Sequence, residues 1–138
     1  MSRYIYVDIE TIPAADPASV PAPKAPSNYK DPDKIAAYIE AARSDAWLET
    51  SLDPLLGRIL CIGWAIDDDP VSVAYNHSGD AKEEIIEAFA SAVRLARADD
   101  VVLTWVGHNI AGFDLRWLYY RACRYGHKEL AQIGRAHV

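Results

Sequence analysis

The chain begins with a run of strong strand-forming residues. Residues 3–9 (Arg-Tyr-Ile-Tyr-Val-Asp-Ile) predict a strand, which Pro13 closes. Residues 58–66 are apolar almost throughout and predict a second strand in the middle of a sheet. A turn at Asp67-Asp68-Asp69-Pro70 leads to a third predicted strand at residues 71–75. These three strands are expected to form an antiparallel meander.

Two later segments place apolar residues at helical spacing. The first, capped near Ser78 or Asp80, is expected to bury Ile85, Ile86, Phe89, Val93 and Ala96. Residues 101–106 predict a strand that ends at Gly107-His108-Asn109. A last helix begins near Phe113. Its inward-facing residues are expected to be Leu115, Leu118, Tyr119 and Ala122, while Arg116, Tyr120 and Arg124 share another face.

A proline-rich excursion interrupts this pattern. Seven of the eight prolines lie in residues 13–54, which predicts an irregular, extended path. Within it, Asp31-Pro32 is typical of a helix cap followed by the first helical residue, and the helix should continue to about Leu52. Apart from this excursion, the order β-β-β-α-β-α predicts one α/β domain with helices packed against a sheet.

Composition restricts the kind of protein. The 138 residues are 51% hydrophobic and 25% charged, as in a soluble domain, and we expect a cytoplasmic location because no signal peptide or membrane span is evident. Cys61 and Cys123 lie in apolar segments and are expected to be reduced core residues. The net charge of −6 argues against a protein that coats nucleic acid by bulk electrostatics. It is compatible with a metal-dependent nuclease.

Three carboxylates are candidates for metal binding. On a strand, Asp8 and Glu10 point the same way, and two adjacent carboxylates repel unless a cation lies between them. Asp114 follows a buried strand, so it can point back over the end of the sheet. Oxygen-only ligands suit Mg²⁺ or Mn²⁺. Taken singly, each residue has a simpler interpretation: a solvated strand edge for Asp8 and Glu10, and a helix cap for Asp114. Asn109 and the glycines Gly107 and Gly112 could equally be turn residues.

Two motifs carry a resemblance to a known family. Residues 6–13, Tyr-Val-Asp-Ile-Glu-Thr-Ile-Pro, and residues 107–114, Gly-His-Asn-Ile-Ala-Gly-Phe-Asp, resemble the first and second motifs of the DEDD 3′→5′ exonuclease superfamily. The resemblance covers residues 3 to about 127. It is closest to predicted exonucleases similar to the proofreading domain of family-B DNA polymerases. It implies a ribonuclease H-like mixed sheet, an antiparallel three-strand meander plus a parallel strand.

The resemblance also implies roles for individual residues. Asp8 would bridge two metal ions, Glu10 would bind the ion that activates the attacking water, and Asp114 would hold the second ion. The ions would lie about 3.5–4 Å apart and promote hydrolysis of single-stranded DNA from its 3′ end. The substrate-binding residues would be Thr11, Ile12, Asn109 and Phe113.

Other residues near these motifs have open or weaker interpretations. Arg116, Tyr120 and Arg124 could contact an incoming single strand, or could form a solvated helix face. We do not expect His77 or His108 to act as a general base, and His108 is expected to satisfy backbone groups near the strand end. In this superfamily the base-like Tyr or His lies in a third motif.

The third motif is missing from the sequence. After Asp114 the only carboxylate is Glu129, and no Tyr-x-x-x-Asp or His-x-x-x-Asp occurs. The last six residues, 133–138, can be encoded by ATC GGA AGA GCA CAC GTC, a string found in a common short-read sequencing adapter. We therefore expect residues 1–132 to be a C-terminally truncated, inactive exonuclease domain, with the excursion at 13–56, and residues 133–138 to be artefact.

Two other functions remain open on the same residues. The motifs do not distinguish the sugar, so an exoribonuclease is one alternative. A non-catalytic ribonuclease H-like module that binds nucleic acid or assists assembly is the other.

Overall fold

The computed structural model describes residues 1–76, 84–98 and 101–135, which fall into two compact units. Unit 1 comprises Met1–Glu10 and Ile59–Val138, and unit 2 comprises Thr11–Arg58. The boundary falls within the first strand and at the start of the second. The candidate carboxylates Asp8, Glu10 and Asp114 all belong to unit 1.

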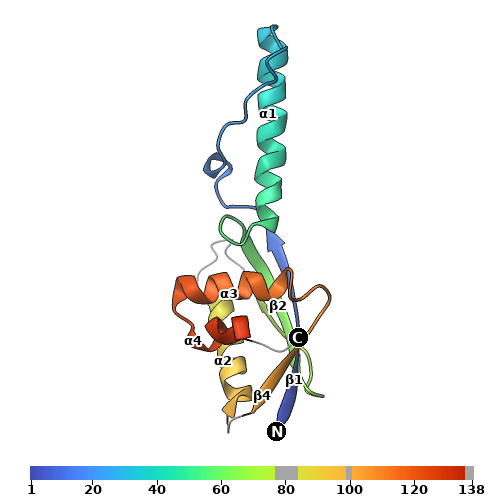
Figure 1. The fold of residues 1–138 in the computed structure, drawn as a ribbon, viewed down its shortest axis with the longest axis vertical. Helices are drawn as coiled ribbons and strands as arrows, with labels where there is room; N and C mark the ends of the chain where they lie inside the picture. Colours follow the sequence, from blue (N-terminus) through green and yellow to red (C-terminus); the bar gives the residue numbers. More distant parts are fainter. Residues whose placement is uncertain (77–83, 99–100, 136–138) are drawn as a thin grey trace. The chain divides into compact units, whose positions relative to one another are not determined.

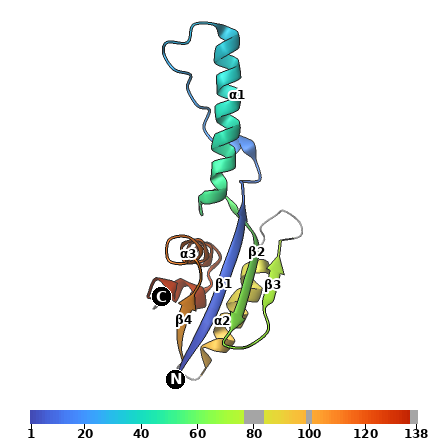
Figure 2. The ribbon, with the colours of Figure 1, turned by 90° about the vertical axis from the view of Figure 1, so that its right-hand side faces the viewer.

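A four-stranded mixed sheet forms the centre of unit 1, in the order β3-β2-β1-β4 (Figures 1 and 2). The strands are β1 (Ser2–Ile12), β2 (Arg58–Ile66), β3 (Ser72–Tyr75) and β4 (Val102–Val106). β1 and β4 are parallel, with Tyr6 opposite Val106, whereas β2 and β3 are antiparallel. The end of β2 returns to the start of β1, where the Asp67 N–H donates to the Tyr4 carbonyl at 2.9 Å. The predicted mixed α/β fold, a meander plus a parallel strand, is confirmed.

Helices cover one side of this sheet (Figure 1). They are α2 (Glu84–Ala96), α3 (Asp114–Tyr125) and α4 (Lys128–Ala131), followed by the 3₁₀ helix η4 (Gln132–Arg135). The core combines residues from strands and helices: Ile5, Val7, Ile9, Ile62, Trp105, Phe89, Val93, Trp117, Leu118 and Leu130. Phe89 lies at its centre, with its ring centroid 5.4 Å from Trp64 and 6.1 Å from Trp105. The predicted caps at Ser78 and Asp80 lie outside the described residues, and α4 and η4 were not predicted.

The buried side of α3 differs in part from the prediction. Leu115, Leu118 and Ala122 are buried as expected, but Tyr119 is 39% exposed, so its predicted inward position is wrong. The helix buries a stripe that also includes Trp117 and Arg121. Because successive residues turn by about 100° around a helix, Tyr119 falls outside this stripe although it adjoins Leu118.

The cysteines are also less buried than predicted. Cys61 is half-buried, and Cys123 is exposed on α3, so the prediction that both are core residues is wrong. Their neighbours are apolar in sequence, but the register of β2 and the rotation of α3 turn both away from the core. Both thiols are free. In the described part of the chain, no helix is long and apolar enough to cross a membrane.

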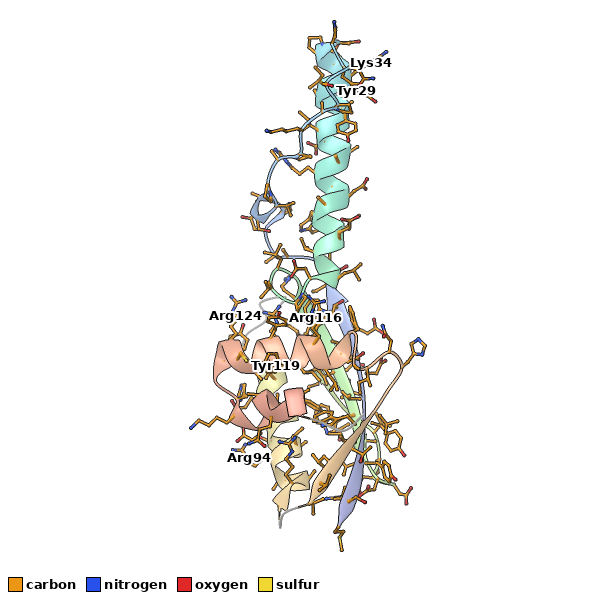
Figure 3. The ribbon with its side chains drawn as sticks, in the orientation of Figure 1. Tyr29, Lys34, Arg94, Arg116, Tyr119 and Arg124 are labelled. Carbon is orange, nitrogen blue, oxygen red and sulfur yellow. The ribbon has the colours of Figure 1, made fainter. Side chains whose placement is uncertain are left out.

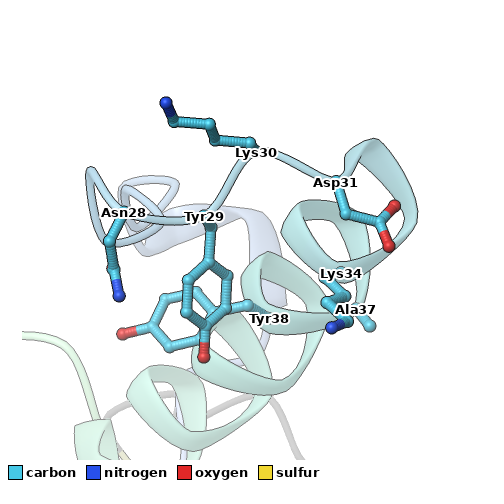
Figure 4. Close-up of a pocket in the computed structure, with 7 residues that line it drawn as sticks. All are labelled: Asn28, Tyr29, Lys30, Asp31, Lys34, Ala37 and Tyr38. Carbon is cyan, nitrogen blue, oxygen red and sulfur yellow. The ribbon is translucent and has the colours of Figure 1, made fainter.

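Unit 2 is built around α1 (Pro32–Glu49), preceded by the 3₁₀ helix η1 (Pro17–Ser19) and followed by η2 (Thr50–Leu52). Asp31 caps α1 by accepting from the Asp33 N–H at 3.0 Å, as predicted. α1 buries none of its own residues, and its end is held by the indole of Trp47, which donates to the Ala14 carbonyl at 2.8 Å. An open pocket of about 780 Å³ lies where the rings of Tyr29 and Tyr38 meet edge to face (Figure 4). No predicted site residue lines it.

Candidate functional site

The first two carboxylates lie on the uncovered face of β1. Val7 and Ile9, each 5% exposed, point into the core, so the intervening Asp8 and the following Glu10 point outward and are exposed. This alternation follows from the two-residue period of a strand. Asp8 and Glu10 therefore share one face, as predicted.

Asp114 reaches the same strand from α3. It is 4% exposed, and its Oδ1 accepts a hydrogen bond from the Ile9 N–H at 2.9 Å. β4 ends opposite Tyr6, three residues before Ile9, so β1 continues past its parallel neighbour. β4 therefore has no carbonyl opposite the Ile9 N–H, and the Asp114 carboxylate accepts this hydrogen bond instead. Phe113, not Asp114, is the cap residue of α3, and Asp114 bonds to the strand.

The electrostatic surroundings of Asp114 include the other two carboxylates. Burial raises the pKa of Asp114, the largest effect on this group. Hydrogen bonds from the N–H groups of Ile9 and of Asp114 itself act in the opposite direction, and the negative charges of Asp8 and Glu10 raise the pKa further. Asp114 therefore lies in the negative field of Asp8 and Glu10, and a nearby cation would relieve the repulsion.

By donor chemistry, the three carboxylates fit a hard divalent ion. All three residues offer carboxylate oxygens, the ligands that Mg²⁺ and Mn²⁺ prefer. Within residues 1–76, 84–98 and 101–135, however, no three His, Cys, Asp or Glu side chains are gathered closely enough to hold one ion together. Asp114 is fixed by Ile9, whereas Asp8 and Glu10 are exposed and can change rotamer. Shared coordination therefore requires these two side chains to move towards Asp114.

The loop between β4 and α3 positions Asp114. A Cβ on Gly107 would lie 2.7 Å from the Val7 carbonyl oxygen, so only glycine allows the loop to pass this close to β1. Asn109 has a φ of 48°, in the left-handed region, and its carbonyl accepts from the N–H groups of Gly112 and Phe113, each at 3.1 Å. The interpretation of Gly107 and Asn109 as turn residues is therefore correct. Contact between Asn109 and a substrate stays a prediction.

The remaining predicted substrate residues lie in different surroundings. Phe113 is half-buried, with its ring 6.0 Å from that of Trp117. In unit 2, the Thr11 hydroxyl donates to the Ser51 carbonyl at 2.6 Å, and Ile12 is half-buried. Their proximity to a terminal nucleotide stays a prediction.

An open pocket of about 490 Å³ adjoins Asp8 on the uncovered face of the sheet. Its lining is mostly apolar and includes Tyr6, Trp64, Val106 and His108. His108 is exposed, and its ring has no hydrogen-bond partner in the described part of the chain, contrary to the expectation that it satisfies backbone groups. His77 lies outside the described residues.

Arg121 is a buried cation that the sequence pattern did not single out. It is 4% exposed, and its guanidinium lies 5.6 Å from the centroid of the Trp117 ring. Burial lowers its pKa. Arg121 lies four residues after Trp117 and three after Leu118, so helical spacing alone places it on the buried side of α3. A charged residue is nevertheless ordinarily assigned to the solvent side.

Comparison with known proteins gives a likeness in fold. No family model and no curated protein matches the chain. Its structure is similar to that of the family B DNA polymerase from the hyperthermophilic archaeon Pyrobaculum calidifontis, with a TM-score of 0.50 and 19% sequence identity. The match covers 91% of this chain and 11% of the polymerase chain. Identity this low shows a shared fold alone, consistent with a ribonuclease H-like α/β architecture.

Proposed function

We propose that Asp8, Glu10 and Asp114 are metal-binding carboxylates of a 3′→5′ exonuclease that hydrolyses single-stranded DNA. The observation that carries the proposal is the position of all three carboxylates around Ile9 of β1. Two exposed carboxylates share one face of β1, and the buried Asp114 bonds to the residue between them. Likeness in fold to part of a DNA polymerase is in keeping with a nucleic acid as the substrate class.

Each residue would have a separate part in the reaction. The Ile9 N–H holds the Asp114 carboxylate in a fixed position, whereas Asp8 and Glu10 are exposed and would face a substrate bound on the open side of β1. When bound, two Mg²⁺ or Mn²⁺ ions would neutralise charge on the attacking and leaving oxygens. The resemblance implies a fourth carboxylate, so we expect at most a trace of hydrolysis from these three.

Metal binding tests the site directly. Mn²⁺ binding to the 138-residue chain can be measured by electron paramagnetic resonance at pH 7. Asp8→Asn, Glu10→Gln and Asp114→Asn should each weaken binding by at least about tenfold, roughly 1.4 kcal/mol. Asp45→Asn, a change of an exposed carboxylate in α1, is the matched control and should have no effect. Equal Mn²⁺ binding in all these variants would refute the assignment.

A hydrolysis assay tests the direction of cleavage along the strand and the kind of nucleic acid that is cleaved. With the chain in excess over a 5′-labelled single-stranded DNA, any Mn²⁺-dependent products should shorten stepwise from the 3′ end and disappear in Asp8→Asn. Internal cleavage, or full activity in Asp8→Asn, would contradict the proposal. Faster degradation of an RNA of the same sequence would favour the exoribonuclease alternative, because the motifs do not distinguish the sugar.

A further inference from the structure

The side of α3 that faces away from the core carries cationic and aromatic side chains. Arg116, Tyr119, Tyr120 and Arg124 are all exposed and together form what we call the α3 outer face. Figure 3 shows Arg116, Tyr119 and Arg124 spaced along this helix. After Asp114, α3 contains no carboxylate. The α3 outer face is therefore locally positive in a chain of net charge −6.

The side chains of the α3 outer face contact one another. The Arg116 guanidinium lies 6.0 Å from the centroid of the Tyr120 ring, and the Tyr119 and Tyr120 rings are 6.0 Å apart at 74°. The Arg124 guanidinium lies 5.7 Å from the Tyr125 ring. Guanidinium groups placed against aromatic rings keep their N–H groups available for an anion.

Neither arginine is neutralised by a neighbouring acid. In the part of the chain that the structure describes, Arg116 and Arg124 form no ion pair, whereas Arg3 pairs with Asp67 at 2.7 Å and Arg94 lies 3.8 Å from Glu129. Two cations without an anionic partner, in an otherwise acidic protein, are suited to an external anion.

A ligand that uses both kinds of side chain must combine repeated negative charge with flat apolar rings. Single-stranded nucleic acid has both, because its phosphates pair with arginine and its bases stack on aromatic rings. An acidic peptide would satisfy the arginines but would gain little from the tyrosines.

We propose that the α3 outer face binds the single strand on which the proposed exonuclease acts, and this inference rests on that proposed function. Asp114 is the first residue of α3, and Arg116 follows two residues later. Arg116 and Arg124 are separated by about 12 Å along the helix axis, at 1.5 Å per residue. For hydrolysis from the 3′ end, a strand bound along α3 would have its 3′ end near the start of the helix, where Asp114 lies.

Binding without metal separates this proposal from catalysis. The affinity of the 138-residue chain for a fluorescein-labelled oligothymidylate is measured by anisotropy in EDTA, over a range of salt concentrations. Loss of two phosphate contacts in the Arg116→Gln/Arg124→Gln double variant should lower the slope of log K against log salt by about 1.4, at 0.7 per contact. Arg43→Gln, at an exposed arginine of α1, is the matched control and should leave the slope unchanged.

Stacking is tested with Tyr120→Ala. Loss of one stacked base should weaken binding by roughly 5- to 140-fold, from 1–3 kcal/mol per base, and should leave the salt slope unchanged. All three substituted side chains are exposed, so the thermal unfolding midpoints should match that of the unsubstituted chain. That measurement excludes loss of fold as the cause.

Several results would overturn the proposal. One is a salt slope for the double variant equal to that of Arg43→Gln. Another is competition by polyglutamate as effective as by oligothymidylate, with no effect of Tyr120→Ala, which would indicate an acidic-peptide surface. If Mn²⁺ binding proves independent of Asp8, the proposed function fails. The oligonucleotide affinities measured in EDTA would still show whether the α3 outer face binds single-stranded nucleic acid.

Discussion

In the metal-free protein, Asp114→Ala should lower the free energy of unfolding, whereas Asp114→Asn should not. The Asp114 carboxylate is 4% exposed and accepts from the Ile9 N–H at 2.9 Å. Asparagine keeps an oxygen acceptor at this position and removes the charge. Alanine leaves a buried N–H without a partner, which should cost about 1–3 kcal/mol of unfolding free energy. We expect Asp114→Asn to be at least as stable as the unsubstituted chain at pH 7.

The pH dependence provides a second measure of the same effect. Burial raises the pKa of Asp114 in the folded chain above its unfolded value, about 3.9. The contribution of Asp114 to stability should therefore fall as pH rises from about 4 through its folded-state pKa, because folding disfavours the ionised carboxylate. Asp114→Asn cannot ionise and should not show this loss. The two stabilities should converge below the unfolded pKa.

Urea unfolding in EDTA, followed by tryptophan fluorescence at pH 7 and pH 3.5, measures these stabilities. Hydrogen exchange of the Ile9 amide adds a local readout, and its protection should persist in Asp114→Asn and fall in Asp114→Ala. Asp45→Asn controls for removal of a carboxylate at an exposed position. If Asp114→Asn were as destabilised as Asp114→Ala, the hydrogen bond to Ile9 would not be the interaction that matters.

Three further predictions concern unit 1. Arg3 and the Tyr4 N–H hold the pKa of Asp67 below its usual value, so Asp67→Asn should lower stability at pH 7, and this difference should disappear as pH falls through the folded-state pKa in urea titrations. Gly107→Ala should cost about 1–3 kcal/mol in the same assay, because the new Cβ meets a backbone carbonyl; an unchanged midpoint would contradict this close approach. Asn109→Gly should retain stability, whereas Asn109→Ala should lose about 1 kcal/mol because of its positive φ; equal losses would indicate a side-chain role.

Local sequence information was sufficient for most of the secondary structure. The alternation at Val7, Asp8, Ile9 and Glu10 fixed which side chains face the core, because a strand has a period of two. Asp31-Pro32 marked the start of α1 because capping depends only on neighbouring residues. The position of the predicted carboxylates on strand and helix followed from the same patterns.

Local sequence patterns could not predict contacts between segments that are distant in the sequence. Tyr119 and Cys123 were assigned to the core because they are partly apolar, but the rotation of α3 against the sheet exposes them and buries Arg121 instead. Likewise, Gly107 was identified as a turn residue, and its close approach to the Val7 carbonyl appears only when β1 and β4 are aligned.

The sequence by itself determined that Asp8 and Glu10 share a strand face and that Asp114 starts a helix. Only the tertiary structure decided that Asp114 bonds to Ile9, because that contact depends on β4 ending three residues short of it. The exposure of Arg116 and Arg124 on α3, by contrast, followed from the helical period alone. Sequence periodicity specifies which side chains share a face of one helix or strand. Which faces contact each other depends on how the helices and strands pack.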